Sequence, residues 1–407
     1  MSWHAHTQGN TDAYSSQTAD MPQLDPLKLL QDAVRCNTIS SLNRDEELAS
    51  MLAETLERFG IKSELRRTSA GVANLTATLR GARPGPRLVL NGHLDTVPIG
   101  EREWSYPPFS AEIVGDRLYG RGTADMKGGL VALLCAFIGA KDAIATGAGE
   151  LVFAACHGEE TGSHGAKRML EDDHLPEFDA MIVAEPTSNL PLNAHKGAFW
   201  VEIAAIGRTA HSSAPSEGVN AIDAIQLFRR KLDDMPLPSD ATGHLSPATM
   251  AVTRISGGKG NNVVPDTCTM TMDFRTLPCQ DHGALLESLK RVAATAAQEM
   301  PGSEIEVRKL VDLPSVRTAP DADIIESVQS ALDETGRGRA TLGAANYFTD
   351  ASVFQKAGGD IVILGPGRAD QAHQTDEFIE ISEFHAAIGI YAAAIRDFHT
   401  TGSKQKP

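Results

Sequence analysis

The sequence predicts an α/β fold in which a mostly parallel sheet is covered by helices and carries an inserted, ferredoxin-like α+β unit. Three observations support this prediction. Short apolar runs typical of buried strands alternate with helical patterns in the first and last parts of the chain. Between these parts, the predicted elements follow the order β-α-β-β-α-β. The length of 407 residues also exceeds what one hydrophobic core usually serves.

The main sheet is predicted from apolar runs and helical spacing. Apolar residues recur at helical spacing over 27–34 and 47–59, and Gly60 ends the second helix. Residues 129–143 show the pattern of a buried helix. Apolar runs predict further strands at 87–90, 150–156, 180–184 and 361–364. Strands that are apolar throughout are typical of parallel sheets with both faces covered.

The predicted inserted unit occupies the middle of the chain. Its expected elements are a strand at 201–206, a helix at 219–232, strands at 249–255 and 268–274, a helix at 282–299 and a strand at 304–310. This order is that of the ferredoxin-like fold. We therefore predict a flexible leader over 1–24, a main domain formed by 25–196 and 312–400, and an inserted domain over 197–311.

Composition and charge narrow the range of partners. The net charge of −16 disfavours nucleic acid and anionic membrane surfaces, because phosphate binding needs clustered Lys and Arg. The longest mostly apolar run, 130–140, is too short to span a bilayer. Five scattered cysteines argue against a disulfide framework, and no basic stretch followed by an apolar core stands near the N-terminus. We therefore expect a cytoplasmic protein without a secretory signal.

Five short segments with acids and histidines fall where predicted strands end. They are 92–98, 120–129, 157–161, 184–187 and 372–377. In parallel sheets, ligands sit beyond the carboxyl ends of the strands, which is where these segments are expected. Two of their histidines and four of their carboxylates form one candidate set. This set predicts a paired divalent-metal site with one acid left over as a base, and therefore a metal-dependent hydrolase.

The first two segments carry His93, Asp95 and Asp125. His93 and Asp95 stand two apart at a strand end, so both project on one face. Asp95 is a partner for the His93 imidazole, or it serves the site through another contact made on folding. Asp125 lies among glycines that let backbone approach an ion, and its carboxylate can bridge two metals. Asp125 can equally cap the following helix.

The next segments carry the other three acids and the other histidine of this set. Glu159 and Glu160 follow a buried strand, where two adjacent acids are costly to desolvate unless cations lie nearby. One can bind metal while its neighbour moves a proton; the alternative is a pair of solvated acids in a loop. Glu185 and His373 each follow an apolar strand. We expect His157, which precedes Glu159, not to be a ligand.

With these residues assembled, the chain resembles the two-zinc aminoacylase and exopeptidase family that contains acetylornithine deacetylase, succinyl-diaminopimelate desuccinylase and glutamate carboxypeptidase. The resemblance covers about residues 26–398, with all five segments in order. It implies two divalent ions, zinc foremost, although cobalt or manganese also suits such ligands. The implied ligands are His93, Asp125 and Glu185 for one ion and Asp125, Glu160 and His373 for the other.

The resemblance also implies roles for residues beside the metals. Glu159 would be the general base, Asp95 would orient His93, and a cis peptide would follow Asp125. One position departs from the family pattern, because Gly158 stands where relatives usually carry Asp. The ligand and the base are both present, so we expect activity. We also expect the loop that carries Glu159 and Glu160 to be held by other contacts than in relatives.

Three residues of the inserted unit match family positions that act on the substrate. His211 would reach across a dimer interface to stabilise the oxyanion, and the alternative is a surface histidine in a turn. Asn262 and Arg275 would hold the substrate carboxylate, although Arg275 can also pair with a protein acid. The inserted unit is thus expected to be a lid and dimerisation domain, and the protein a homodimer with His211 acting in trans.

The implied function is metal-dependent hydrolysis of the amide bond of a small N-acyl amino acid, most like that of acetylornithine deacetylase. Alternatives are a succinyl-diaminopimelate desuccinylase or other deacylase, a dipeptidase or carboxypeptidase, and a non-catalytic binding protein that has kept the fold. Dinucleotide binding is disfavoured, because Gly120 and Gly122 lack the third glycine of that fingerprint.

Overall fold

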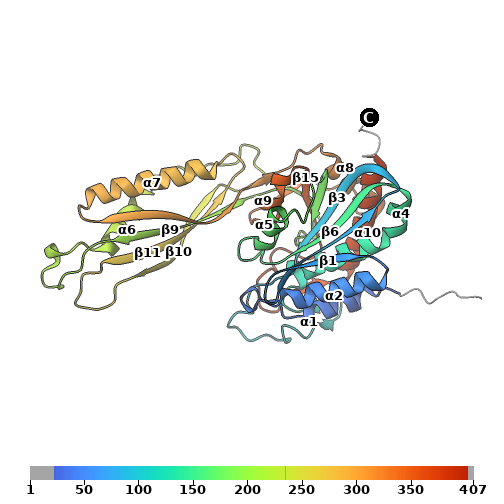
Figure 1. The fold of residues 1–407 in the computed structure, drawn as a ribbon, viewed down its shortest axis with the longest axis horizontal. Coiled ribbons are helices and arrows are strands. Elements are labelled where there is room, and N and C mark those ends of the chain that lie inside the picture. The colour runs from blue at the N-terminus through green and yellow to red at the C-terminus, as the bar shows by residue number, and fades with distance from the viewer. Residues whose placement is uncertain (1–22, 234, 402–407) are drawn as a thin grey trace, which may run out of the picture.

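The structure is a computed structural model that describes residues 23–233 and 235–401. Residues 1–22 of the predicted leader lie outside the described residues. Figure 1 shows an elongated molecule, in which a broad unit built around the main sheet continues into a slender unit built around a second sheet. The predicted fold class is confirmed.

The main sheet has nine strands in the described ranges, in the order β1-β2-β6-β3-β7-β15-β8-β13, with β14 beside β8. Its strands are β1 (Ser63–Ser69), β2 (Val72–Arg80), β3 (Arg83–His93), β6 (Ala148–Cys156), β7 (Ala180–Val183), β8 (Leu192–His195), β13 (Val316–Arg317), β14 (Gly343–Ala345) and β15 (Asp360–Ile363). The four strands predicted from apolar runs are β6, β3, β7 and β15, which lie side by side and parallel. Strands β1 and β2 extend the sheet antiparallel on one side, and β13 pairs antiparallel with β8 on the other.

Helices cover both faces of this sheet (Figure 1). One face packs on α1 (Pro26–Arg35), α2 (Asp45–Arg58), α3 (Gly128–Gly139), α8 (Asp323–Glu334) and α10 (Ile381–Thr401). The other packs on α5 (His164–Glu171) and α9 (Ala351–Phe354). Along β6, Phe153 points into the first core and Val152 into the second. Burial on both sides explains why these strands are apolar throughout.

One predicted helix is divided. The single helix expected over 129–143 ends at Gly139, and α4 (Lys141–Thr146) begins two residues later. All but the last residue of α3 are buried, whereas α4 begins with the polar pair Lys141 and Asp142 at the surface. The Lys141 ammonium donates a hydrogen bond to the carbonyl oxygen of Phe59 at 2.7 Å. The helix is therefore interrupted where the sequence changes from apolar to charged.

The inserted unit has the predicted β-α-β-β-α-β order. Its elements are β9 (Gly197–Ile206), α6 (Ala221–Lys231), β10 (Thr249–Gly257), β11 (Thr267–Thr276), α7 (His282–Glu299) and β12 (Glu304–Leu313). The sheet order β10-β11-β9-β12 is antiparallel throughout, and its core lies against α6 and α7. A third, small sheet joins β4 (Glu112–Val114), β5 (Arg117–Tyr119) and β16 (Phe378–Glu380). The domain boundaries proposed from the sequence stay predictions.

The packing of α3 against β7 generates a stability prediction. A Cβ at Gly129 would lie 2.0 Å from the carbonyl oxygen of Ala184, the residue before Glu185. We expect Gly129→Ala to lower the free energy of unfolding by about 1–3 kcal/mol, because the helix must move off the strand. Gly139→Ala is the control in the same helix, where a Cβ meets nothing within 4 Å. Denaturant titrations that show equal stabilities for the two variants would contradict this account.

Candidate metal centre

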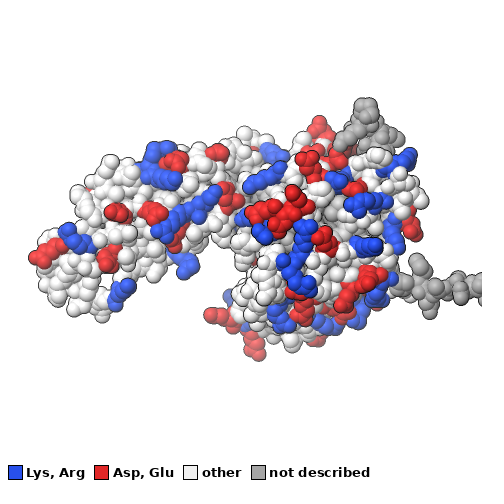
Figure 2. Space-filling view, in the orientation of Figure 1, with Lys and Arg blue, Asp and Glu red and all other residues white. Residues whose placement is uncertain are grey.

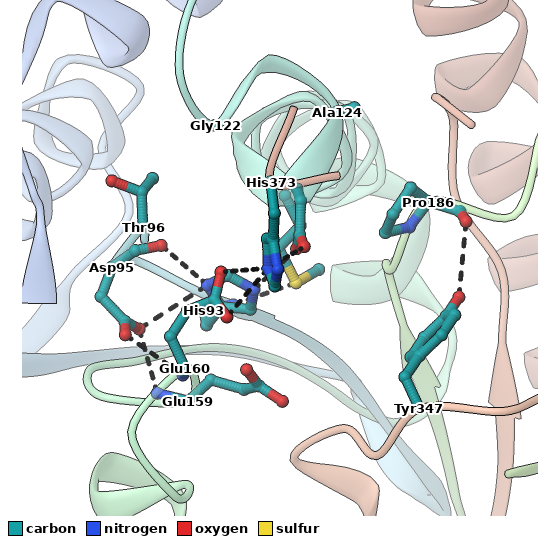
Figure 3. A network of polar contacts seen from close by, with 12 residues as sticks. His93, Asp95, Thr96, Gly122, Ala124, Glu159, Glu160, Pro186, Tyr347 and His373 are labelled. Atoms are coloured by element: carbon teal, nitrogen blue, oxygen red, sulfur yellow. Dashed lines mark hydrogen bonds and ion pairs between the residues drawn. The ribbon is translucent and has the colours of Figure 1, made fainter. Parts of the chain in front are cut away.

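The five segments meet at the carboxyl ends of the central strands. The fold places His93 at the end of β3, Glu159 and Glu160 after β6, Glu185 after β7, Asp125 just before α3, and His373 between β15 and β16. In Figure 3 the imidazoles of His93 and His373 point toward one centre, beside the loop that carries Glu159 and Glu160. Because parallel strands end at one edge of the sheet, segments far apart in the sequence converge there.

Two groups of three side chains have the spacing of metal ligands. One group is His93, Asp125 and Glu185, and the other is Asp125, Glu160 and His373. In each group, one ligand atom of every residue lies within 4.8 Å of the others. Asp125 belongs to both groups. These are the two ligand sets that the family resemblance implies, and their role as ligands is part of the function proposed below.

The Asp125 carboxylate faces both groups. Its Oδ1 lies 3.1 Å from Nε2 of His93, and its Oδ2 lies 3.3 Å from Nε2 of His373. The His373 Nε2 is also 3.2 Å from the Glu160 carboxylate. One Asp125 oxygen thus faces the group of His93 and the other faces the group of His373, which is the arrangement of a carboxylate that bridges two ions. The peptide bond between Asp125 and Met126 is cis, as expected.

Asp95 contacts the site in two ways. The Nδ1 of His93 lies 2.9 Å from the backbone oxygen of Asp95 and 3.6 Å from its carboxylate. The Asp95 carboxylate itself accepts hydrogen bonds from the backbone N–H groups of Glu159 at 3.0 Å and Glu160 at 3.2 Å, and from the Ser40 hydroxyl at 2.8 Å. The Nδ1–H bond to the carbonyl leaves Nε2 of His93 free for a metal ion. Asp95 therefore also holds the loop that carries the paired acids.

The loop after β6 turns at a glycine. Gly158 has φ +67, a left-handed conformation that glycine adopts without steric cost. The preceding His157 lies away from both ligand groups, with Nε2 3.0 Å from the Thr68 hydroxyl oxygen, and burial lowers its pKa to about 4. Among the described residues, no hydrogen bond engages the Glu159 carboxylate, which is buried beside the two groups. Glu159 is therefore placed to accept a proton.

Burial raises the cost of charge in this cluster. It raises the pKa values of Glu159 and Glu185 well above their ordinary value, and that of Glu160 as well. Burial also acts to raise the pKa of Asp125, but hydrogen bonds from His373 and His93 outweigh it and hold that pKa below its ordinary value. Divalent cations favour ionised carboxylates, so this cluster of oxygen and nitrogen atoms fits zinc, cobalt or manganese.

A pocket of about 240 Å³ opens beside the cluster. It is lined by Asp125, Glu159, Glu160, Glu185, Pro186, Arg275, Tyr347, Phe348, Ala369, Ala372 and His373. Arg275 reaches it from β11 of the inserted unit, with its guanidinium 5.5 Å from the Phe348 ring centre and ion-paired with Asp273 at 3.1 Å. Both roles considered for Arg275 are thus compatible. Sequence patterns assigned no pocket-lining role to Pro186, Tyr347 or Phe348, because lining a pocket leaves no local signal.

His211 and Asn262 do not line the pocket of their own chain. Both are exposed, and the Asn262 carbonyl accepts a hydrogen bond from the backbone N–H of Ser212 at 3.0 Å. Asn262 precedes the first residue of β11, Thr267, whereas Arg275 lies near the other end of that strand. At about 3.3 Å per residue, the eight steps from Thr267 to Arg275 span roughly 26 Å, and Asn262 lies five residues before Thr267.

Sequence comparison identifies the family. Residues 89–397 match the peptidase family M20/M25/M40. The chain belongs to this family. It is therefore an enzyme of the metal-dependent amidohydrolase and peptidase class.

Individual M20 relatives resemble the chain over nearly its whole length. A probable succinyl-diaminopimelate desuccinylase of Staphylococcus aureus is 30% identical over 90% of this chain and 96% of its own. The acetylornithine deacetylase of Vibrio cholerae is also 30% identical, over 93% of this chain and 100% of its own. The fold is similar to that of the M20 metallo-carboxypeptidase Sso-CP2 from Sulfolobus solfataricus, with a TM-score of 0.76 and 21% identity over 93% and 100% of the two chains.

Another similar fold is that of the Bacillus subtilis YXEP protein, described as a dinuclear metal binding peptidase. Its TM-score is 0.71, with 18% identity over 94% of this chain and 98% of its own.

Acidic and basic side chains are interspersed on the described face seen in Figure 2, and the net charge is −16. Of the helices in the described ranges, none is both long and apolar enough to cross a membrane.

Metal binding should release protons. Hydrogen bonds to Asp125 and Glu160 raise the pKa of His373 to about 10, so near neutral pH its imidazole holds a proton that a metal ion must displace. The affinity for Zn²⁺ should therefore fall as the pH falls, since protons compete for the ligand. Calorimetry of Zn²⁺ binding in buffers of different ionisation enthalpy measures this release. Identical apparent enthalpies in all buffers would show that no proton is displaced.

Proposed function

We propose that this chain hydrolyses the amide bond of a small N-acyl amino acid with two divalent metal ions, zinc or cobalt. The observation that carries the proposal is the pair of ligand groups that share Asp125, with Glu159 buried beside them. When bound, a pair of such ions would supply Lewis-acid catalysis at this site. The proposed ligands are His93, Asp125, Glu160, Glu185 and His373.

Glu159 acts as the general base in this proposal. Its carboxylate lines the pocket, and burial keeps its pKa above the ordinary value, which suits a group that takes up and returns a proton. Glu159 accepts a proton from the attacking water and passes it to the nitrogen of the leaving amine. Asp95 keeps the Glu159 loop and the His93 ring in place through the contacts described above.

The pocket favours a substrate with one carboxylate. Apart from the His373 imidazole, Arg275 is the only cationic side chain among the described residues that line it. A guanidinium donates two parallel hydrogen bonds to a carboxylate. Acetylornithine carries one carboxylate, whereas the succinyl group of succinyl-diaminopimelate adds another beside the two of the amino acid. We therefore propose an acetylornithine deacetylase activity first, and a desuccinylase activity second because of the 30% identical relative.

A substrate panel tests this choice. We expect the zinc- or cobalt-loaded enzyme to turn over N-acetylornithine with a higher kcat/KM than succinyl-diaminopimelate or dipeptides. A preference for succinyl-diaminopimelate would select the second activity, and a preference for dipeptides would assign a peptidase. A fully loaded enzyme that turns over no amide in the panel would contradict the proposed class.

Replacement of the base should abolish turnover without loss of metal. We expect Glu159→Gln to lower kcat by at least about 100-fold, because general acid–base catalysis contributes that much or more. Metal content measured by mass spectrometry should match the wild type. Glu171→Gln, on the exposed end of α5, is the control and should keep full activity. If Glu159→Gln retains wild-type kcat, the base is another group.

We further propose a homodimer in which the inserted units pair. The strand β10 lies at the edge of its sheet, and eight of its nine residues are exposed. It presents Val252 and Ile255 to solvent, with exposures of 41% and 60%. Natural proteins usually protect or cover such an edge. A second copy is the proposed cover, since His211 and Asn262 are too far from the pocket of their own chain.

A cytoplasmic location stays a prediction, supported by five unpaired cysteines.

A complementation experiment tests whether His211 acts in trans. We expect His211→Ala to lower kcat by about 100-fold or more, because an oxyanion donor is lost. Mixed dimers of His211→Ala and Glu159→Gln chains pair one intact base with one intact His211. Their activity should exceed that of either parent dimer. An inactive mixture, with dimer exchange verified by mass spectrometry, would place His211 outside the partner's site.

A further inference from the structure

The segment 372–377 contains a second acid that no role above includes. Glu377 has no exposed surface, and both of its carboxylate oxygens face the loop that leads to Asp125. Oε2 accepts hydrogen bonds from the Arg121 guanidinium at 2.6 Å and the Gly122 N–H at 3.0 Å. Oε1 accepts from the N–H groups of Ala124 at 2.9 Å and Asp125 at 3.1 Å. One carboxylate therefore satisfies three backbone donors of this loop.

Further contacts fix the same junction. The Gly120 N–H donates to the backbone oxygen of Glu377 at 2.9 Å. The buried Arg121 also donates to the Pro98 carbonyl at 3.2 Å and lies 5.1 Å from the ring centre of Trp104. Asp376 accepts hydrogen bonds from the N–H and hydroxyl of Ser105 at 2.7 and 2.8 Å. The segment that follows His373 is thus joined to the loop of Asp125 by Glu377 and to Ser105 by Asp376.

We propose that Glu377 is a positioning residue that holds the shared ligand Asp125 and the ligand His373 at the spacing two metal ions require. It touches neither a ligand side chain nor the pocket, and it acts through the backbone of Asp125 and through its own place four residues after His373. Partners behind metal ligands commonly contribute 10- to 100-fold in metal affinity. The proposal rests on the two-metal function proposed above.

The exchange of Glu377 for Gln removes this support with little change in volume. Each carboxylate oxygen accepts two donors, so an amide NH₂ at either place would face two N–H groups that need an acceptor. Glu150→Gln is a matched control, because Glu150 also pairs with arginines, Arg80 at 2.9 Å and Arg87 at 2.6 Å. Glu150 lies at the start of β6, at the opposite end of that strand from Glu159.

The test is a titration of the metal-free full-length protein with Co²⁺, followed by its visible absorption. We expect Glu377→Gln to bind Co²⁺ about 10- to 100-fold more weakly than the wild type, with an altered spectrum, and Glu150→Gln to match the wild type. If Glu377→Gln does not fold, Glu377→Asp replaces it; this carboxylate is one methylene shorter and cannot reach all three N–H groups, so the same loss is expected.

The outcomes separate the two proposals. Two Co²⁺ ions bound with wild-type affinity and spectrum in the Glu377 variant would make Glu377 purely structural, and this inference would be wrong. An equal loss of Co²⁺ affinity in Glu150→Gln would also overturn the inference, because the loss would then not depend on where the replaced glutamate lies in the fold. A wild-type protein that binds no Co²⁺ would refute the proposed metal function itself.

Discussion

The site depends on one electrostatic constraint: four carboxylates, two buried (Glu159, Glu185) and two partly buried (Asp125, Glu160), lie close to one another and to two imidazoles. Such a cluster is unfavourable in a protein interior unless protons or cations compensate its charge. The spacing around Asp125 gives the two imidazoles opposite oxygens of one carboxylate, so that compensation by two cations is geometrically available. The fold around the cluster serves to hold like charges together.

The loops that carry these acids are held mainly by hydrogen bonds from backbone N–H groups. Asp95 accepts two N–H groups of the loop that carries Glu159 and Glu160, and Glu377 accepts three N–H groups of the loop that carries Asp125. Both carboxylates are buried and satisfied by donors, whereas no hydrogen bond among the described residues engages the buried Glu159 carboxylate, which can accept a proton. Acids of the same type therefore have different tasks, decided by which donors surround them.

The two units of the chain supply different chemistry. The main sheet holds the metal-ligand candidates at the ends of β3, β6 and β7, whereas the inserted unit brings Arg275 to the same pocket. The other end of the inserted unit carries His211 and Asn262, on the side away from that pocket. A second copy would bring these two residues within reach of a substrate. In the proposed function, substrate recognition is therefore divided between the two units, whereas all proposed metal ligands belong to the main unit.

The local sequence was sufficient to predict the strands that are buried on both faces of the sheet. The strands β3, β6, β7 and β15 are apolar because helices cover both faces, and that pattern is visible without a structure. The strands β1 and β2 escaped prediction, since their sequences mix polar with apolar residues and form no continuous apolar run. The ligand candidates could also be named from the sequence, because the five segments that carry them stand in the order of the family that the chain resembles.

Tertiary structure decided what distance in the sequence conceals. The contact between Glu377 and the loop of Asp125 joins residues about 250 positions apart, and no local pattern encodes such a pairing. The same holds for Tyr347 and Phe348 in the pocket wall and for the position of Asp95 under the paired acids. Residue types set the chemistry that is available, and only the folded chain determines which groups meet, because hydrogen bonds and ion pairs act over a few ångströms.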